Sequence, residues 1–230
     1  MDQHRKITQF LRKATYPSAN TLILQTTRSL EYNQKKFPTI KQVVIPNFIN
    51  RFNHIEQEKE KIILYVGRFA WEKAPMRLVQ AFSKIEDKRG YRLIMCGDGP
   101  QFEEVKNFIG DLSLNSHIEL KGKVKHPEKY YSKASIYVLP SILEGFPNAL
   151  CEAMSFGLAC VCYDTIPYED LGESGKDFLV VGQDFPTLHE ALIHIIENKQ
   201  VIENLSKNAK DIKVRLNNKI IGEMFLNLLN

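Results

Sequence analysis

The chain has 230 residues, of which 43% are hydrophobic and 25% are charged, a composition typical of a globular protein and not of a disordered one. No apolar run reaches the roughly 20 residues that a membrane-spanning helix needs. The N-terminus, MDQHRKITQF, lacks the apolar core of a signal peptide. The four cysteines form no Cys-x-x-Cys pair and have no metal-ligand spacing with histidine. These features predict a protein of a reducing compartment, the cytoplasm.

Positive charge is concentrated in the N-terminal segment, residues 1–50. This segment holds eight Lys or Arg and two acidic residues, whereas the rest of the chain holds 23 basic and 25 acidic residues. A basic segment of this kind can face anionic lipid or phosphate. A solvated helix surface explains the charge equally well, and the charge pattern alone leaves both interpretations open.

The N-terminal segment has too few strands to form a sheet domain of its own. Its patterns predict, in chain order, a helix at 3–14, a strand at 21–27, a helix at 28–36 and a strand at 42–46. One or two strands do not make an independently stable sheet. We therefore expect this segment to dock against the domain that follows or against a partner.

From residue 62 onward, short β-branched runs alternate with amphipathic stretches. Strands are predicted at 62–67, 92–97, 117–122, 134–140, 158–163 and 178–182. Helices are predicted at about 74–86, 100–112, 126–132, 147–156, 186–198 and, at the end, 217–229. This alternation predicts an α/β fold with a Rossmann-like parallel sheet and helices on both faces. Ligands of such sheets bind beyond the carboxyl ends of the strands, so the loops there should carry the chemistry.

The most informative loop is VLPSILEGFPNALCEAMSFG, residues 138–157. Pro147 is well placed to begin a helix, whose N-terminal amide groups would form an anion site suited to a diphosphate. The expected free amides are those of Phe146, Asn148 and Ala149. Glu144 and Glu152 flank this site and can accept hydrogen bonds from sugar and ribose hydroxyls. For either glutamate alone, a helix cap or a surface ion pair would be the simpler interpretation, but the pair in this setting favours ligand binding.

The segment E-G-F-P-N-A-L-x-E-A-M resembles the E-x7-E motif of retaining glycosyltransferases of the GT-B fold, family 4. The resemblance covers nearly the whole chain, because further segments match the family in the same order. These are VVIPNFIN (43–50), VGRFAWEKAP (66–75), CGDGP (96–100), KGKV (121–124) and YDTIPYEDLGESGKDFLVV (163–181). The sequence departs from the family at Ala74 and Phe48, where glycine is usual.

The resemblance implies roles for individual residues. Arg68 and Lys73 would hold the donor diphosphate, Glu144 would contact the donor sugar, and Glu152 would hold the ribose. Arg68, Lys73 and Glu144 are therefore the predicted catalytic residues. A guanidinium fork and a mobile ammonium are suited to neutralising a leaving diphosphate. The full set of predicted donor-binding residues is Gly67, Arg68, Lys73, Gly97, Gly99, Val124, Glu144, Gly145, Phe146, Pro147, Asn148, Ala149 and Glu152.

The predicted reaction needs no metal and no cofactor. The chain contains no Asp-x-Asp, so basic residues and a helix N-terminus are expected to replace a metal ion at the diphosphate. The resemblance implies transfer of a hexose or N-acetylhexosamine from a nucleotide diphosphate sugar with retention of configuration. UDP is the favoured nucleotide, with GDP as the alternative. The expected acceptor is a lipid-linked or surface polysaccharide, which implies peripheral association with the inner membrane face.

Three regions are expected from the resemblance. Residues 1–50 would be the tail of an N-terminal acceptor domain and a linker, 51–213 the nucleotide-sugar-binding domain, and 214–230 a C-terminal helix that crosses back. The chain would then bind donor but need not transfer sugar alone. A fragment, a truncated product and a split enzyme with a separate acceptor chain are the open alternatives. Apolar surface left by a missing domain could also drive self-association.

Other functions fit the sequence less well. A glycosidase places two carboxylates across one glycosidic bond, whereas Glu144 and Glu152 share one loop and helix. A sugar-nucleotide epimerase or a phosphorylase on a related fold is a further alternative. An epimerase would need an acid/base pair placed across both domains, and His117, His126, His189 and His194 are predicted at strand edges or helix surfaces. A dehydrogenase is disfavoured because Gly67 stands alone, without the G-x-G-x-x-G that binds a dinucleotide. A nucleotide-binding module without turnover remains the main alternative, and nucleic acid is not an expected partner.

Overall fold

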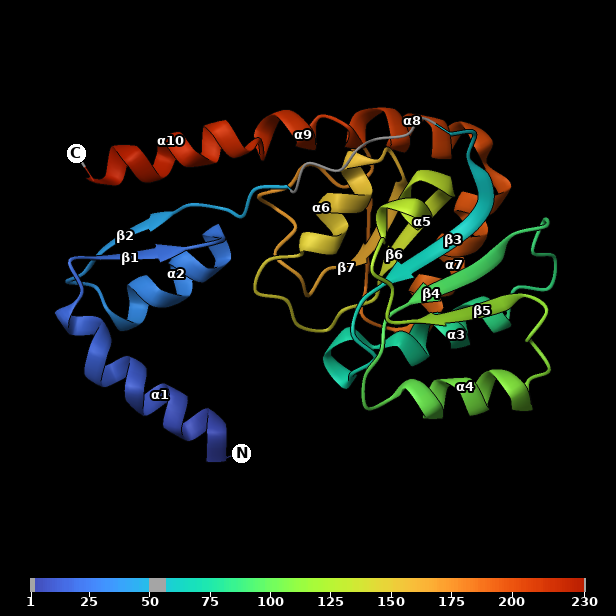
Figure 1. Ribbon diagram of the computed structural model, residues 1–230, viewed down its shortest axis with the longest axis horizontal. Coiled ribbons are helices and arrows are strands. Elements are labelled where there is room, and N and C mark those ends of the chain that lie inside the picture. Colours follow the sequence, from blue (N-terminus) through green and yellow to red (C-terminus); the bar gives the residue numbers. More distant parts are fainter. Residues whose placement is uncertain (1–2, 50–56, 230) are drawn as a thin grey trace.

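Residues 3–49 and 57–229 are described by the computed structural model. Six parallel strands form the main sheet, in the order β5-β4-β3-β6-β7-β8 (Figure 1). The strands are β3 (Glu60–Val66), β4 (Arg92–Cys96), β5 (Ile118–Gly122), β6 (Ala134–Leu139), β7 (Ala159–Tyr163) and β8 (Leu179–Val181). The predicted Rossmann-like α/β fold is therefore confirmed, and each predicted strand is present.

Helices cover both faces of the main sheet. One face packs against α3 (Pro75–Ser83), α4 (Phe102–Asp111) and α7 (Phe185–Glu197), and the other against α5 (Glu128–Lys133), α6 (Asn148–Ser155) and α9 (Ile212–Arg215) (Figure 1). Successive strand residues alternate between the two resulting cores. Every residue of β6 and β7 is buried, as the continuous apolar sequence of these strands requires.

The N-terminal segment forms a separate two-stranded parallel sheet. Its elements are α1 (Gln3–Thr15), β1 (Thr21–Leu24), α2 (Thr27–Lys36) and β2 (Lys41–Val44). The predicted strand at 21–27 was too long, because Thr26 begins the helix instead of continuing the strand. Its side chain accepts a hydrogen bond from the backbone N–H of Ser29, which caps α2.

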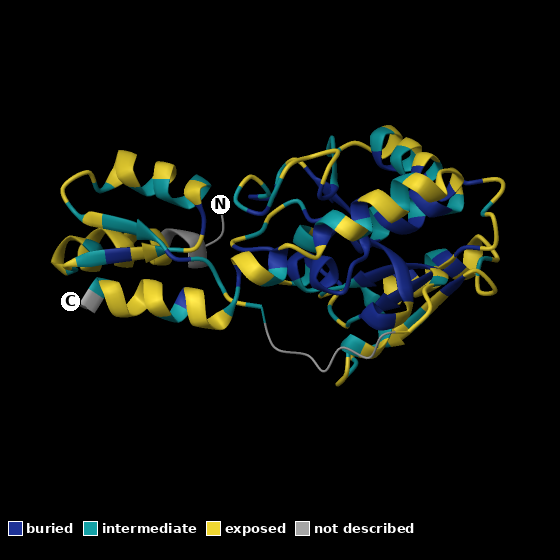
Figure 2. Ribbon diagram, turned by 90° about the horizontal axis from the view of Figure 1, so that it is seen from above, coloured by how far each residue is buried: buried dark blue, intermediate teal, exposed yellow. Residues whose placement is uncertain are grey.

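The C-terminal part of the chain connects the two sheets. Helix α8 (Lys199–Ala209), which the sequence did not predict, contributes to both cores and is followed by α9. Helix α10 (Asn218–Leu229) then runs beside β1 and β2 (Figures 1 and 2). Within residues 3–49 and 57–229, no helix is long and apolar enough to cross a membrane. The domain boundaries at residues 50 and 213 stay a prediction.

Candidate functional site

The loops that follow β3, β4 and β5 are joined to one another through their backbones. The N–H of Gly67 donates to the carbonyl of Cys96 (3.0 Å), and that of Gly97 donates to the carbonyl of Gly122 (2.8 Å). A Cβ at Gly97 would lie 1.8 Å from the carbonyl oxygen of Gly67, so a side chain has no room there. The predicted site glycines Gly67 and Gly97 thus belong to one continuous backbone surface at the carboxyl edge of the sheet, which Gly99 extends. The fold supports this surface as a place for close ligand approach.

Gly99 and Val124 complete this edge. Gly99 has φ +153° and its Cβ would lie 2.5 Å from the carbonyl oxygen of Phe69, so the loop after β4 touches the loop after β3. Val124 follows β5, is half-buried, and packs against the core that contains α6. Both residues border the carboxyl edge, as predicted, and their binding roles stay predictions.

Lys73 and Glu144 form an ion pair between two loops that are 71 residues apart in sequence. Lys73 ends the short 3₁₀ helix η2 (Trp71–Lys73) after β3, and its Nζ lies 2.5 Å from Oε1 of Glu144 in the loop after β6. The two side chains are 25% and 8% exposed, respectively. The backbone reinforces the contact, because the N–H of Ile142 donates to the carbonyl of Glu72 (2.8 Å). Glu144 therefore pairs with a cation and does not cap α6.

Arg68 has a fixed backbone and an exposed side chain. The hydroxyl of buried Tyr65 donates to the Arg68 carbonyl (2.8 Å), and that of buried Tyr137 donates to the Val66 carbonyl (3.3 Å). Burial raises the pKa of both tyrosines, so both hydroxyls stay protonated donors. The guanidinium of Arg68 forms no ion pair with any residue of the described ranges. It is thus a cation available to an anionic ligand, carried by the same loop after β3 that leads to Lys73.

The N-terminus of α6 offers two free amide groups and not the predicted three. Asn148 donates its N–H to the carbonyl of Phe146 (2.9 Å), which removes it from the predicted set. The N–H groups of Phe146 and Ala149 donate to no acceptor in the described part of the chain. Pro147 is buried at the helix start and Gly145 is exposed before it. The remaining two amides still form a site of positive potential beside Glu144.

Glu152 lies one turn further along α6 and contacts Tyr131 of α5. The Tyr131 hydroxyl donates to Oε2 of Glu152 (3.1 Å). Burial raises the pKa of Glu152, while the hydrogen bond from Tyr131 lowers it to a smaller extent. Glu152 is therefore not part of a surface ion pair. The sequence analysis missed Tyr131, because no local pattern links it to a glutamate 21 positions later.

Two cavities meet at this site. A cavity of about 360 Å³ is lined by Glu152, Asn148 and the linker residue Asn47, among others. A larger cavity, of about 720 Å³, separates the N-terminal segment from the loop that holds Glu144 and Gly145. The side chain of Asn47 donates to Oδ1 of Asn148 (3.0 Å) and accepts from Gln25 (2.6 Å). A chain of amides thus links the N-terminal segment to the start of α6, and Asn47 and Gln25 are residues that the sequence analysis missed.

The site's charges are arranged for an anion bordered by hydroxyl groups. Arg68, Lys73 and the N-terminus of α6 supply positive potential, and the two glutamates supply acceptors. No group of three or more His, Cys, Asp or Glu that could hold a metal occurs in residues 3–49 and 57–229. Metal independence itself stays a prediction for experiment. Histidines 117, 126 and 194 are exposed, as expected, and His189 is half-buried against the carbonyl of Ala81.

Comparison with known proteins gives one family. The family model described as Glycosyl transferases group 1 matches residues 47–212. The chain is 29% identical over 206 residues to an exopolysaccharide phosphotransferase of Streptomyces coelicolor, covering 86% of this chain and 22% of that protein. It is 25% identical over 222 residues to a Campylobacter jejuni α-1,4-N-acetyl-D-galactosaminyltransferase named for an acceptor linked to PP-undecaprenol, covering 91% of this chain and 60% of that protein. The chain thus spans less than two thirds of these relatives.

Two solved structures illustrate the fold that this chain shares with known proteins. The structure of Staphylococcus aureus TarM in complex with UDP has a TM-score of 0.85 at 20% identity, over 93% of this chain and 44% of that chain. The pneumococcal O-GlcNAc transferase GtfA in complex with UDP and GlcNAc has a TM-score of 0.82 at 20% identity, over 95% and 46%. At 20% identity this likeness establishes the fold of this chain and nothing further.

Proposed function

The chain belongs to the family Glycosyl transferases group 1, and we propose that it forms the donor-binding half of a retaining glycosyltransferase. In this proposal, residues 51–213 bind a nucleotide diphosphate sugar, residues 1–50 belong to the acceptor side, and residues 214–230 cross back to it. The transferred group is a hexose or N-acetylhexosamine. UDP is the proposed nucleotide, supported by the fold shared with two structures that are complexes with UDP.

The observation that carries the proposal is the Lys73–Glu144 ion pair at the N-terminus of α6. It holds a cation and a carboxylate near two free amides at the carboxyl edge of a parallel sheet, and the exposed Arg68 belongs to the same loop as Lys73. A phosphate group can be neutralised by the cations and the amides, while Glu144 accepts a hydrogen bond from a sugar hydroxyl. Glu152, on the next turn, would accept a hydrogen bond from a ribose hydroxyl.

Transfer would break the bond between the anomeric carbon and the diphosphate oxygen, with the electron pair going to the diphosphate. The acceptor hydroxyl oxygen would form the new bond to the same carbon, and its proton would go to the released diphosphate. Arg68, Lys73 and the amides of α6 would stabilise the negative charge that develops on the leaving group. Because these groups supply positive charge, the proposal includes no metal ion and no cofactor.

We propose a lipid-linked or surface polysaccharide as the acceptor, bound in the 720 Å³ cavity between the N-terminal segment and Glu144. Support comes from the Campylobacter jejuni relative, whose name gives a PP-undecaprenol-linked acceptor. The basic N-terminal segment is compatible with a cytoplasmic protein that binds the inner membrane face peripherally.

Calorimetric titration with UDP and GDP tests the donor assignment. The purified chain is titrated first with EDTA and then with Mg²⁺, beside an Arg68→Ala/Lys73→Ala variant. Lys106→Ala, which alters an exposed pair on α4, is the matched control. We expect metal-independent binding of UDP that the double variant loses and the control keeps. Equal UDP binding by the double variant, or no binding by the folded chain, would contradict the donor-site assignment.

A second function, nucleotide binding without turnover by this chain alone, is favoured by the exposed apolar residues outside the main sheet. Phe10 of α1 is 70% exposed and Leu226 of α10 is 61% exposed, which is unusual for large apolar side chains. Such surface suits a separate acceptor-domain chain or self-association. Assay of UDP-sugar turnover by the chain alone separates the two functions, because a split enzyme would bind UDP but release no sugar until its partner is added.

A further inference from the structure

Phe48 is an exposed aromatic residue in a segment that is otherwise anchored. Ile45 and Ile49, close to it in the chain, pack against the core that contains α6. Their N–H groups donate to the carbonyls of Leu24 (2.8 Å) and Leu216 (3.0 Å). Phe48 itself is 53% exposed, and its ring stacks on no other ring of the described residues. The anchored backbone thus presents this residue to solvent in a fixed place.

Leu143 is presented in the same way by the loop after β6. On one side of it, the N–H of Ile142 donates to the carbonyl of Glu72 (2.8 Å). On the other side, Glu144 pairs with Lys73. Leu143 lies between these two attachments and is nevertheless 61% exposed. Large apolar side chains that a fixed backbone leaves exposed are typical of binding sites.

Phe48 and Leu143 line one cavity, of about 720 Å³, together with Glu144. Small-molecule sites usually have volumes of about 300–1,000 Å³, so this cavity has the size of such a site. The rest of its lining includes many groups that form hydrogen bonds. Among them are Tyr16, Gln25, Tyr32, Asn33, Asn47 and Thr165. The cavity thus combines two exposed apolar side chains with hydroxyl and amide groups.

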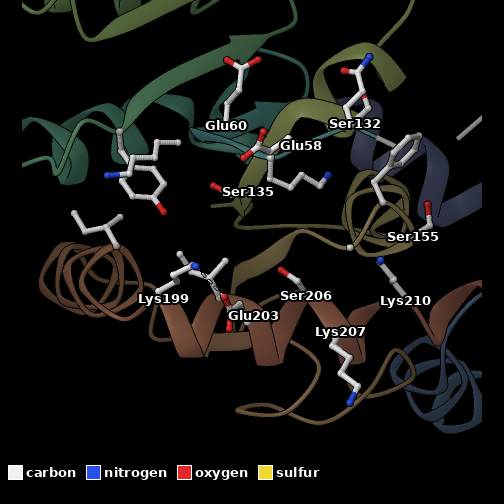
Figure 3. A pocket seen from close by; sticks show the side chains of 18 of the residues that line it. Glu58, Glu60, Ser132, Ser135, Ser155, Lys199, Glu203, Ser206, Lys207 and Lys210 are labelled. Atoms are coloured by element: carbon white, nitrogen blue, oxygen red, sulfur yellow. Dashed lines mark ion pairs between the residues drawn. The ribbon is translucent and has the colours of Figure 1, made fainter. Parts of the chain in front are cut away.

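The largest cavity of the described residues lacks this combination. It has a volume of about 1080 Å³ and is lined mainly by charged and serine side chains, with ion pairs such as Lys199–Glu203 (Figure 3). The aromatic residues in its lining, Tyr91 and Phe156, are both buried. This cavity therefore presents no exposed ring to a ligand, and the arrangement around Phe48 is not a general property of the protein's surface.

The combination of apolar and hydrogen-bonding groups matches the surface of a sugar ring. The hydroxyl groups of a pyranose lie around its rim, while its axial C–H groups form an apolar face that packs against aromatic and aliphatic side chains. A lipid chain would leave the amide and hydroxyl groups of the cavity without partners. A protein partner needs about 800 Å² of surface on each side, far more than two side chains supply. A sugar is therefore the occupant that fits this cavity.

We propose that Phe48 and Leu143 form a platform for the apolar face of the acceptor's terminal sugar. This inference rests on the proposed function, in which Glu144 contacts the donor sugar. Leu143 directly precedes Glu144, so a ring on the platform lies next to the sugar that is transferred. Phe48 stands where the family resemblance predicts glycine, and the platform thus adapts this chain to an acceptor that a glycine would not contact. It selects sugars whose axial hydrogens form an uninterrupted face.

Saturation-transfer difference nuclear magnetic resonance tests the platform with three sugars as probes. These are the methyl β-D-glycosides of glucose, galactose and allose, added to the chain in the presence of saturating UDP. Glucose and galactose have only axial hydrogens at C1, C3 and C5, which form one apolar face, whereas allose has an axial hydroxyl at C3 that interrupts this face. We expect saturation of the glucoside, the galactoside or both, strongest at these three protons, and little saturation of the alloside. Equal saturation of the alloside, or no saturation of any probe, would overturn the proposal.

Variants assign sugar binding to the platform. Phe48→Ala should weaken binding of the saturated glycoside by about fivefold or more, roughly 1 kcal/mol, and Phe48→Gly should do the same. Phe48→Tyr keeps an aromatic face and should retain the affinity, while Leu143→Ala should weaken it to a smaller extent. Val214→Ala, which alters a residue of α9 that is 67% exposed, is the matched control and should leave it unchanged. Circular dichroism checks that each variant is folded.

The variants also give the results that would contradict the platform. Unchanged glycoside binding by Phe48→Ala would overturn it, and so would a loss in Phe48→Tyr or Val214→Ala as large as the loss in Phe48→Ala. Failure of the donor-site assignment has a different signature, because it appears as absence of UDP binding in the calorimetric titration. Glycoside binding that depends on Phe48 would still be observed in that case.

Discussion

Asp170 binds the first turn of α2 from a loop that lies 143 residues later in the sequence. Its Oδ2 accepts from the backbone N–H of Thr27 (2.8 Å), and its Oδ1 accepts from the Thr27 hydroxyl (2.5 Å). The adjacent Arg28 donates to the carbonyl of Thr165 (2.8 Å) and pairs with Glu169. These contacts attach the N-terminal segment to the loop after β7, next to the cavity that contains Glu144.

Removing the Asp170 carboxylate should loosen the N-terminal segment without unfolding the main sheet. Asp170→Ala leaves two donors of Thr27 unpaired, a loss of roughly 0.5–2 kcal/mol in the attachment of α2. Hydrogen exchange should become faster in α2 and stay unchanged in β6 and β7. Glu173→Ala, which removes only an exposed pair with Lys176 in the same loop, is the control. Unchanged exchange in α2 would mean that the contact contributes nothing.

Breaking the Lys73–Glu144 pair should destabilise the fold. Lys73→Met leaves a carboxylate that is only 8% exposed without its cation. Because Lys73 itself is partly exposed, we expect a loss of about 1–3 kcal/mol, less than for a fully buried pair. Urea denaturation measures the loss. In Lys73→Met/Glu144→Gln the unpaired charge is absent, so the double variant should be more stable than Lys73→Met alone. Additive losses would argue against coupling of the two residues.

Replacing Ala74 by glycine should stabilise the protein. Ala74 has φ +44° and ψ +48°, the left-handed region, in which glycine, the residue expected at this position from the family resemblance, is not strained. Removing the strained Cβ should raise the free energy of unfolding by roughly 0.5–1 kcal/mol. Ala81→Gly, inside α3 and fully buried, should lower it by about 1 kcal/mol. If thermal denaturation gave both variants the same sign, the strain at Ala74 would be refuted.

Glu152 should make stability depend on pH. Its folded pKa is raised above the ordinary value of 4.5 by burial, so the folded state binds the proton more tightly than the unfolded state. Its contribution to stability is therefore greatest below pH 4.5 and falls as the pH rises through the folded pKa. Glu152→Gln stays neutral and should remove this fall, so its stability relative to the parent should be higher at pH 7 than at pH 4.

Chemical denaturation between pH 4 and pH 8 measures the effect, with Glu104→Gln, an exposed residue of α4, as the control. A parent and a Glu152→Gln variant that differ by the same amount at every pH would contradict the raised pKa. The same Glu152 variant should also weaken UDP binding several-fold if the residue holds the ribose, because an amide accepts a hydroxyl less strongly than a carboxylate.

Elements with a strong local pattern were predicted well from the sequence. The strands β6 and β7 were recognisable as continuous, mostly apolar runs. Their sequences are apolar throughout because both faces of these strands are buried. The resemblance to family 4 is confirmed by the family match over residues 47–212. The buried residues of helices α8 and α9, Leu205, Ala209 and Ile212, have the spacing of one helix face, but the segment 199–215 is otherwise mostly polar and the sequence analysis missed both helices.

Contacts between distant parts of the chain could not be predicted. The order of residues placed Glu144 and Lys73 in two separate loops, and only the neighbouring positions of β3 and β6 bring these loops together. The Tyr131–Glu152 hydrogen bond and the Asn47–Asn148 contact depend in the same way on packing. The backbone amide of Asn148 was predicted to be free, but in the structure it donates to the carbonyl of Phe146 in a tight turn. The roles of the site residues and the domain boundaries stay predictions.

The contact between Gly67 and Gly97 has a consequence for mutating the proposed donor site. Because the carbonyl of Gly67 occupies the space of a side chain at position 97, any mutation there would separate the two loops before it could contact a ligand. Position 99 is closed in the same way by the backbone of Phe69. A library of variants should therefore keep both glycines and vary the exposed Asp98, which lies between them, and the exposed Pro100, which follows Gly99.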